Sequence, residues 1–180
     1  MTRASTAFTQ RDLRDAFGLF ATGVTVVTAV RPDGDTVGVT ANSFTSVSLE
    51  PPLLLWCLSA GSSAAPAFTH RAPFAVHVLG HHQVDVALQF ARRAHEKFTN
   101  EAHRRGPHPP HLSGALCRFD CRVHGVHDGG DHLIIVGEVL GLVCGPGAPL
   151  AFHAGRFGHF TADRGVGKVD IWEGLEDHGY

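Results

Sequence analysis

The feature that most constrains the fold is a series of short apolar runs, each bounded by residues that favour turns. Runs of strand length, rich in β-branched and apolar residues, lie at 24–30, 36–41, 44–49, 53–58, 74–79, 115–126 and 132–144. Gly, Pro and Asp separate them, as in 31–34 (RPDG) and 127–131 (HDGGD), and these residues are typical of turns between strands. About six or seven such strands favour a β-barrel, because closing the sheet on itself removes exposed edges.

A few short helices are expected beside the strands. Thr9 is suited to cap a helix, with Asp12 in the first turn and Gly23 at the end. The apolar stripe of this helix has spacings of four and three residues and consists of Leu13, Phe17 and Phe20. Two further short helices are expected at 64–70 and 81–92.

Length and composition indicate one globular domain. The 180 residues fit a domain at 1–160, followed by a polar, Gly-rich tail at 161–180 with a short helix near Ile171. Hydrophobic residues make up 43% of the chain and charged residues 18%, which excludes a disordered protein. The net charge of −2 provides no field that would attract nucleic acid or a membrane. The first twelve residues lack the apolar run of a signal peptide, so a cytoplasmic protein is expected.

The cysteines are expected to be reduced and buried, because they lie in apolar segments of a chain that resembles no secreted disulfide framework. They are Cys57, Cys117, Cys121 and Cys144. The spacing of Cys117, Cys121, His124 and His127 also fits a zinc site. Strand alternation, however, places Cys121 beside Phe119 and Val123 and turns His124 to the opposite face. We therefore expect core cysteines and no metal.

Two polar segments flank the apolar run 53–58. In 40–46 (TANSFTS), small hydroxyl and amide side chains could hydrogen-bond a polar heterocycle. In 59–63 (SAGSS), hydroxyls and free backbone N–H groups before a helix could bind a phosphate. A solvated bend and a plain helix cap are the alternative interpretations of these two segments. Joined by one buried strand, the segments would hold both ends of a ligand that has a ring and a phosphate.

His132 is the third candidate for this cleft. It lies at the start of the last long strand, where a histidine could donate a hydrogen bond and carry a tunable charge, although a surface turn histidine has the same sequence signature. The chain has no Gly-x-Gly-x-x-Gly motif, no Walker-type loop and no Gly-x-Ser-x-Gly elbow. A nucleotide would therefore bind without a Rossmann fold.

In their order and spacing, four segments resemble the flavin reductase-like family, the reductase components of two-component flavin monooxygenases. These segments are 21–28 (ATGVTVVT), 38–52 (GVTANSFTSVSLEPP), 74–79 (FAVHVL) and 130–132 (GDH). The resemblance implies a mainly β fold with short accessory helices, namely a split β-barrel of the FMN-binding, Greek-key type, usually a homodimer. It implies FMN or FAD as the flavin, NADH or NADPH as the hydride donor, and a separate monooxygenase that receives the reduced flavin.

The resemblance also implies roles for individual residues. Those expected to bind the flavin are Thr40, Ala41, Asn42, Ser43, Thr45, Ser46, Ser59, Ser62, Ser63, Ala91, Lys97 and Phe98. Those expected to place the nicotinamide are His132, Gly155, Arg156 and Phe157. His132 is also the catalytic candidate, because it would orient the nicotinamide or stabilise charge on the reduced flavin.

Three other functions fit the same sequence. The chain could be a flavin carrier or sensor without enzymatic activity, or an oxidase or oxygenase that acts on its own substrate. The fourteen histidines would also suit a haem-binding barrel. A cofactor spectrum and an NADH assay with added flavin would separate these possibilities.

Overall fold

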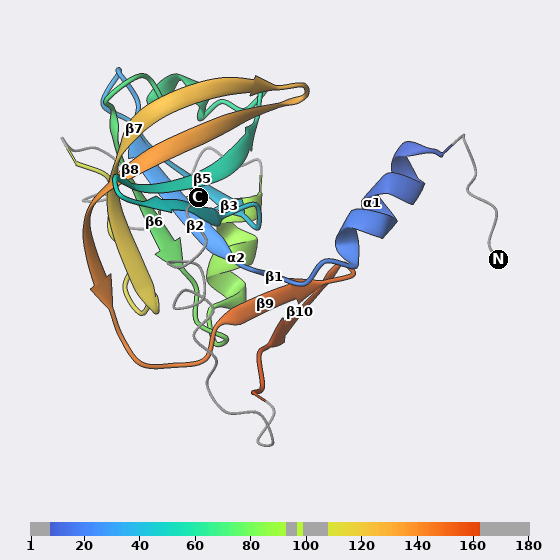
Figure 1. Ribbon diagram of the computed structural model, residues 1–180. Coiled ribbons are helices and arrows are strands. Elements are labelled where there is room, and N and C mark those ends of the chain that lie inside the picture. The colour runs from blue at the N-terminus through green and yellow to red at the C-terminus, as the bar shows by residue number, and fades with distance from the viewer. Residues whose placement is uncertain (1–7, 93–96, 99–107, 163–180) are drawn as a thin grey trace.

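The computed structural model describes residues 8–92, 97–98 and 108–162 (Figure 1). The helices are α1 (Gln10–Gly18) and α2 (Val84–Ala91), with one 3-10 turn at Ala65–Ala67. The strands are β1 (Thr22–Gly23), β2 (Thr25–Val30), β3 (Thr36–Ala41), β4 (Thr45–Leu49), β5 (Pro52–Ser59), β6 (Pro73–Val78), β7 (Cys117–Gly129), β8 (His132–Cys144), β9 (Leu150–His153) and β10 (Arg156–His159).

Seven strands form one antiparallel sheet in the order β3-β2-β6-β7-β8-β5-β4. The sheet curls round its core (Figure 1). Within the described residues its edge strands β3 and β4 are not paired with each other, so the expectation of a closed sheet is wrong and the split barrel is confirmed. The connection between these strands occupies the split instead, because Ser43 bonds to the backbone of β5 at Cys57. A second, three-stranded sheet has the order β1-β9-β10.

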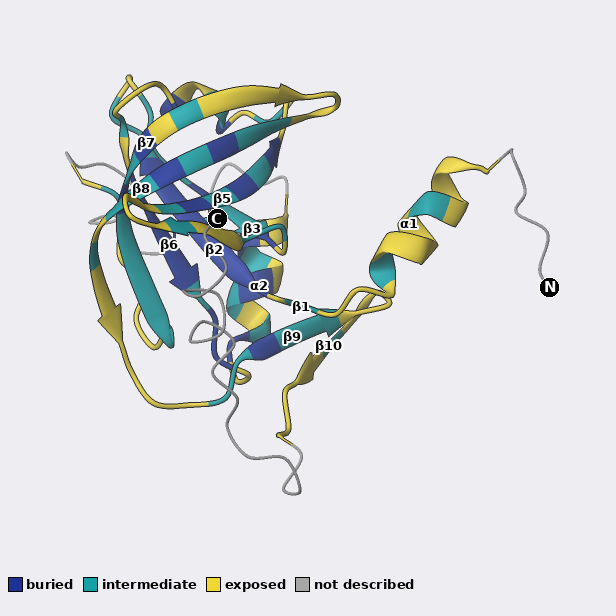
Figure 2. Ribbon diagram, viewed as in Figure 1, coloured by how far each residue is buried: buried dark blue, intermediate teal, exposed yellow. Residues whose placement is uncertain are grey.

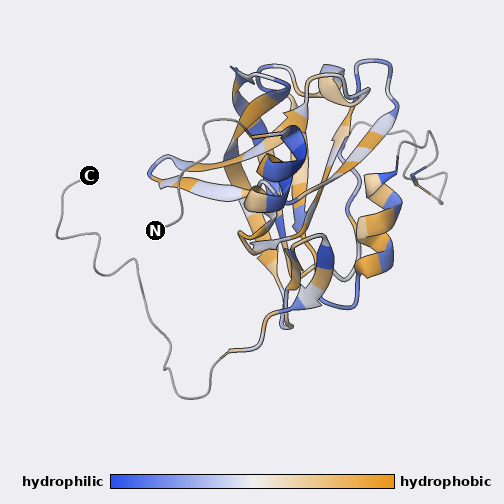
Figure 3. Cartoon of the chain, turned by 90° about the vertical axis from the view of Figure 1, so that its right-hand side faces the viewer, coloured by the Kyte–Doolittle hydropathy of each residue, from blue (hydrophilic) through white to orange (hydrophobic). Residues whose placement is uncertain are grey.

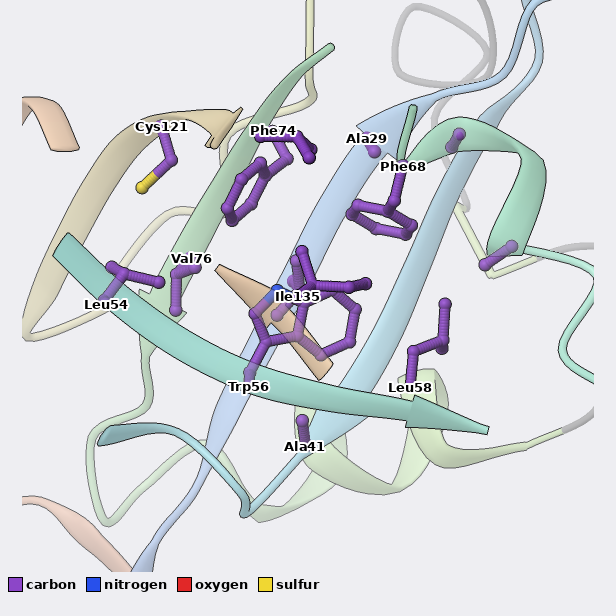
Figure 4. Packing of buried hydrophobic residues seen from close by; sticks show 14 residues of the cluster. Ala29, Ala41, Leu54, Trp56, Leu58, Phe68, Phe74, Val76, Cys121 and Ile135 are labelled. Carbon is purple, nitrogen blue, oxygen red and sulfur yellow. The ribbon is translucent and has the colours of Figure 1, made fainter. Parts of the chain in front are cut away.

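The main core lies inside the curled sheet (Figure 4). Trp56 is fully buried, and its ring meets Phe68 edge-on at 5.0 Å between centroids. Phe68 in turn meets Phe74 edge-on at 5.9 Å. These aromatic contacts contribute beyond the area that they bury. They also explain a wrong prediction: the helix expected at 64–70 is one 3-10 turn, because the chain leaves helical geometry at Phe68 to place its ring in the core.

A second core lies on the other face of β2, beneath α2. Val24, Val26, Phe90 and Leu150 belong to it. Figure 3 shows hydrophobic residues along the strands and along α2. The helix approaches the sheet closely because β3 has glycine at position 38, where a Cβ atom would lie 2.4 Å from the Phe90 ring.

The helix α1 projects away from the barrel (Figure 1) and is almost entirely exposed (Figure 2). The predicted cap is confirmed: Thr9 and Asp12 form a reciprocal capping box. The predicted end at Gly23 is wrong, since α1 ends at Gly18. The following residues turn back so that Thr22 and Gly23 pair with β9.

The structure corrects the expectation for two of the cysteines. Cys117 and Cys144 face each other across β7 and β8 and form a disulfide, with Cα atoms 4.1 Å apart. Cys57 and Cys121 are free, as expected. Burial, with a smaller contribution from Asp120, raises the pKa of Cys121 to about 12.

Three further expectations concern a metal site, a membrane-spanning helix and the C-terminal tail. The described residues contain no group of three or more His, Cys, Asp or Glu side chains able to hold a metal ion. Within the same residues, no helix has the length and apolar character needed to cross a membrane. The helix expected near Ile171 and most of the expected tail lie outside the described residues.

Candidate functional site

A cavity of about 280 Å³ lies where β3, β5 and β8 come together at the split of the barrel. It has hydroxyl, amide and imidazole groups as well as apolar ones. The lining residues are Val39, Thr40, Ala41, Asn42, Ser43, Cys57, Leu58, Ser59, Ser62 and His132. Three segments that are separate in the sequence therefore supply one wall each. The first wall is 39–43, the second is 57–62 and the third is His132.

A hydrogen bond from β5 fixes the first wall to the second. The Ser43 hydroxyl accepts a hydrogen bond from the backbone N–H of Cys57 at 2.9 Å. Ser43 follows β3, and Cys57 lies within β5, so this contact holds the β3–β4 connection against β5. The hydroxyl oxygen of Ser43 therefore stabilises the cavity wall through this hydrogen bond.

The second wall is fixed to the third in a similar way. The backbone N–H of Ala60 donates to the carbonyl oxygen of Asp131 at 3.0 Å. Beside this contact, Ser59 and His132 are partners in the β5–β8 register. His132 is therefore held at the rim of the cavity next to Ser59.

Asp131 orients the His132 ring. The Nδ1 atom of His132 lies 2.6 Å from Oδ1 of Asp131, which fits an Nδ1–H that donates to the carboxylate. This hydrogen bond is the main reason why the pKa of Asp131 is below its usual value, and the charge of His132 adds to it. With Nδ1 held by the carboxylate, Nε2 is the ring nitrogen that remains for a ligand.

Thr40 has a second task besides lining the cavity. Its hydroxyl donates to the carbonyl oxygen of Ala87 in α2 at 2.7 Å. The proton of this hydroxyl is therefore used to hold α2 on β3, and only the oxygen lone pairs remain for a ligand.

The phosphate-binding prediction concerns Ser59, Ser62 and Ser63, and the first two line the cavity. The Ser62 hydroxyl oxygen accepts from the N–H of Ala64 at 3.2 Å. Its own proton is thus left to donate to a ligand. The side chain of Ser63 is exposed and is not part of the lining.

Several residues predicted from the resemblance lie outside this cavity. They are Thr45, Ser46, Ser63, Ala91, Lys97, Phe98, Gly155, Arg156 and Phe157. The first two begin β4, and Phe98 is buried beside Phe90 in the second core. Gly155 and Arg156 lie at the turn from β9 to β10, where Phe157 packs on Phe152 at 5.3 Å between ring centroids. All of these roles stay predictions.

Lys97 lies behind the β3 wall. Its ammonium group donates to the carbonyl oxygens of Gly38 at 2.9 Å and Phe90 at 2.8 Å. Lys97 thus joins β3 to the last turn of α2, where a positive charge is favoured by the helix dipole. Burial lowers the pKa of this lysine.

Sequence reasoning missed Val39, Cys57 and Leu58 as lining residues. All three residues lie in predicted strands. Their positions near the strand ends were the signal that could have identified them as lining residues. Strand alternation turns Cys57 and Ser59 to the same side of β5. A cavity at the end of β5 therefore includes Cys57 once Ser59 is included.

Comparison with known proteins agrees with these features. The model of the "Flavin reductase like domain" family matches residues 17–161. The FMN reductase (NADH) SmoA of Agrobacterium fabrum is 48% identical over 153 residues, which cover 84% of this chain and 86% of that protein. The reductase component of the flavin-dependent trigonelline monooxygenase of Acinetobacter baylyi is 40% identical over 82% of this chain. The chain spans only 48% of that second protein.

A solved structure shares the fold. The NADH:FAD oxidoreductase SgcE6 of Streptomyces globisporus, in complex with NAD and FAD fragments, is 37% identical. Its TM-score is 0.76, over 86% of this chain and 94% of that one.

Proposed function

We propose that this chain, which belongs to the flavin reductase-like family, oxidises NAD(P)H and transfers the hydride to FMN or FAD. The observation that carries the proposal is the convergence of 39–43, 57–62 and His132 on one cavity within the matched residues. The printed activities of its relatives, FMN reductase (NADH) and NADH:FAD oxidoreductase, support the same reaction.

The cavity fits part of a flavin. A flavin has a ring with polar edges, a polyol chain and a phosphate, and the lining supplies matching groups. Asn42 is exposed at the rim and offers both a donor and an acceptor, and Val39 and Leu58 supply apolar contact for a ring. At about 280 Å³ the cavity is near the lower limit of small-molecule sites, so the remainder of a flavin would extend beyond it.

When bound, a flavin accepts a hydride from the nicotinamide, and this chemistry belongs to the two cofactors. The task of the protein is to hold the two rings in contact and in alignment. The fixed hydrogen bonds of Ser43 and Ala60 serve this task, because they set the cavity walls before any ligand arrives. A protein nucleophile is not required.

His132 is the catalytic residue that we propose. Asp131 holds Nδ1, so Nε2 can donate to or accept from a nicotinamide amide or the polar edge of a flavin. Protonation of the ring would stabilise negative charge on the reduced flavin. Ser59, which is the β5 partner of His132, and Ser62 would donate to a flavin phosphate.

Several further features form part of the proposal. Gly155, Arg156 and Phe157 would help place the nicotinamide nucleotide, and the hydride donor would be NADH or NADPH. The protein would be a cytoplasmic homodimer without a membrane or nucleic-acid partner. A separate monooxygenase would receive the reduced flavin, since relatives of this chain are reductase components of monooxygenases.

The decisive experiment is a steady-state assay of NADH and NADPH oxidation with FMN or FAD added. We expect NADH to be consumed only when flavin is present, with hydrogen peroxide formed in air and no organic substrate oxidised. Flavin binding without NAD(P)H oxidation would instead indicate a carrier. A haem spectrum in the purified protein would contradict the proposal.

A further inference from the structure

The disulfide between Cys117 and Cys144 joins the open end of the β7–β8 hairpin. These two cysteines are the outermost partners of the register at that end, whereas Gly129 and His132 are the outermost partners beside the turn. Cys144 is exposed and Cys117 is half-buried. Exposed disulfides are the labile ones, because reductants and oxidants reach their sulfur atoms directly. This bond is therefore open to redox chemistry.

A permanent disulfide does not suit the location that we propose for the protein. A cytoplasm keeps thiols reduced, and the disulfides that form there are usually transient, either catalytic or redox-sensing. The sheet keeps the two partners together whether or not they are bonded, because the β7–β8 register holds their Cα atoms 4.1 Å apart. The pair can therefore open and close without a rearrangement of the strands.

The disulfide clamps the start of residues 145–149, which we call the connector because they lead from β8 to β9. The N–H of Gly145 donates to the carbonyl oxygen of Leu116 at 2.7 Å. At Gly147 a Cβ atom would lie 2.5 Å from a side-chain carbon of Leu116, so the connector packs tightly on this leucine. Leu116 directly precedes Cys117. The disulfide and these contacts therefore hold the same two segments together.

The connector in turn positions β9 and β10. The N–H of His81 donates to the carbonyl oxygen of Ala148 at 2.9 Å, and the N–H of Leu150 donates to that of Leu79 at 2.9 Å. The turn between β9 and β10 carries residues 155–157, for which we propose a role in placing the nicotinamide nucleotide. A change at the start of the connector would therefore act on the nicotinamide side of the site.

The flavin cavity lies at the other end of the hairpin. His132 and Cys144 are the first and last residues of β8, which has 13 residues. They are therefore separated by about 40 Å along the strand. Neither Cys117 nor Cys144 lines the cavity. The redox state of this pair should leave the affinity for flavin unchanged.

We propose that Cys117 and Cys144 form a reversible redox site, which hydrogen peroxide closes and a dithiol reductant opens, and that the closed form fixes the connector. The thiolate of the exposed Cys144 attacks one oxygen of peroxide, the O–O bond breaks, and a sulfenic acid and hydroxide form. The thiol of Cys117 then attacks the sulfenic sulfur, forms the S–S bond and releases water. Overall, two thiols lose two electrons and two protons, and one peroxide becomes two waters.

The proposed function supplies the oxidant. Reduced flavin that reaches no monooxygenase passes two electrons and two protons to O2, which becomes hydrogen peroxide. Closure of the pair would then accompany turnover that lacks an acceptor for reduced flavin. This source of peroxide rests on the proposed function, whereas closure by added peroxide does not.

Differential alkylation tests the site itself. The folded protein is reduced with dithiothreitol, desalted under argon, treated with an equimolar amount of hydrogen peroxide, alkylated and digested. We expect mass spectrometry to find a disulfide-linked pair of peptides that contain Cys117 and Cys144, and a second treatment with dithiothreitol should return both to the alkylated form. A pair that stays reduced in peroxide, or that resists dithiothreitol in the folded protein, would overturn the proposal.

Comparison of the two redox states of the unmodified protein tests the clamp. Closure should slow hydrogen exchange at the backbone N–H groups of Gly145 and His81 and leave that of Ala60 unchanged. It should also lower the KM for NADH by at least about two-fold, with an unchanged Kd for FMN. Cys117→Ser should lose these responses to peroxide, and Cys121→Ala, a change to the other cysteine of β7, should keep them. Equal exchange in the two states, or an FMN affinity that changes on closure, would overturn the clamp.

Turnover in air separates this proposal from the proposed function. Reduced protein that is given NADH and FMN should close the pair, and catalase should prevent closure. Closure that catalase does not prevent would overturn the role of peroxide. If added peroxide closes the pair but NADH is not oxidised, the reductase function is wrong and the redox site stands. If NADH is oxidised but the pair stays reduced in added peroxide, the redox site alone is wrong.

Discussion

His77 accepts a hydrogen bond through Nε2 from the backbone N–H of Leu112 at 3.2 Å. Its Nδ1 atom lies 3.1 Å from the carbonyl oxygen of Val26, which fits a neutral ring that donates from Nδ1. The ring is fully buried. Together with Thr28, whose hydroxyl donates to the carbonyl of Pro110 at 2.7 Å, His77 fixes the segment before β7 to the sheet.

The first prediction is a loss of stability in mild acid. Burial is the main cause that lowers the pKa of His77 from 6.5 to about 4. Between these values the unfolded chain binds a proton that the folded chain does not, so stability falls as pH falls from about 6.5 to about 4. The contribution is about 3 kcal/mol, from about 1.4 kcal/mol per pKa unit.

Urea unfolding at several pH values measures this effect. His77→Gln can keep a donor and an acceptor but does not titrate, so its stability should fall less steeply over the same pH window. His70 is exposed, and His70→Gln is the matched control with a pH dependence close to that of the unmodified protein. Equal slopes for His77→Gln and the unmodified protein would contradict the assignment.

The second prediction concerns Ser43. Ser43→Ala removes the acceptor for the Cys57 N–H, and an unpaired polar group costs about 1–3 kcal/mol where it is buried. We expect FMN affinity to fall by roughly ten-fold, because the first cavity wall is no longer held against β5. Titration of flavin fluorescence measures the affinity. Ser48→Ala, in β4 and outside the cavity, is the control, and an equal loss there would refute a specific role for Ser43.

The third prediction concerns the pair Asp131 and His132. We expect His132→Ala to lower kcat/KM for NADH by roughly ten-fold or more, and Asp131→Ala to cause a smaller loss. Because Asp131 acts through His132, the double variant should behave like His132→Ala alone. Additive losses would show that Asp131 acts independently, and unchanged kinetics for His132→Ala would remove His132 from the mechanism.

The fourth prediction concerns the packing of α2. In Gly38→Ala the new Cβ atom would lie 2.4 Å from the Phe90 ring, so the helix must shift. Overpacking of this kind costs about 1–3 kcal/mol. Thermal unfolding should show a lower Tm for Gly38→Ala. Gly23→Ala adds a methyl group where no atom lies within 4 Å, and it should leave Tm nearly unchanged.

The fifth prediction concerns thiol reactivity. With Cys117 and Cys144 joined, only Cys57 and Cys121 are available for alkylation. The raised pKa of Cys121 keeps it protonated, so the native protein should react at Cys57 alone. Bound flavin should protect Cys57, which lines the cavity. Peptide mass spectrometry measures both results, and equal labelling with and without flavin would place the flavin elsewhere.

The sequence predicted most of the main sheet. The strands β3 and β8 have the expected ends, because turn residues and β-branched runs mark them clearly. The small sheet of β1, β9 and β10 was missed, since Thr22 and Gly23 pair with β9 more than a hundred residues later. Local composition carries no signal for such a contact.

The site could be predicted only in part, for a similar reason. Small polar residues at 40–46 and 59–63 indicated a ligand, and Thr40, Asn42 and Ser62 do line the cavity. Neighbouring residues differ in the direction of their side chains, and Ser63 and Thr45 do not line the cavity. The disulfide between Cys117 and Cys144 depends on strand register, which spacing along the chain does not define.

The hydrogen bond from Ala60 to Asp131 joins two segments that the ribosome makes at different times. A nascent chain cannot complete the cavity until β8 has left the ribosome and paired with β5. The residues up to Cys57 are synthesised well before β8, so they cannot form the complete cavity until β8 has been made. A ligand that contacts all three segments of the cavity can therefore bind only after β8 has paired with β5.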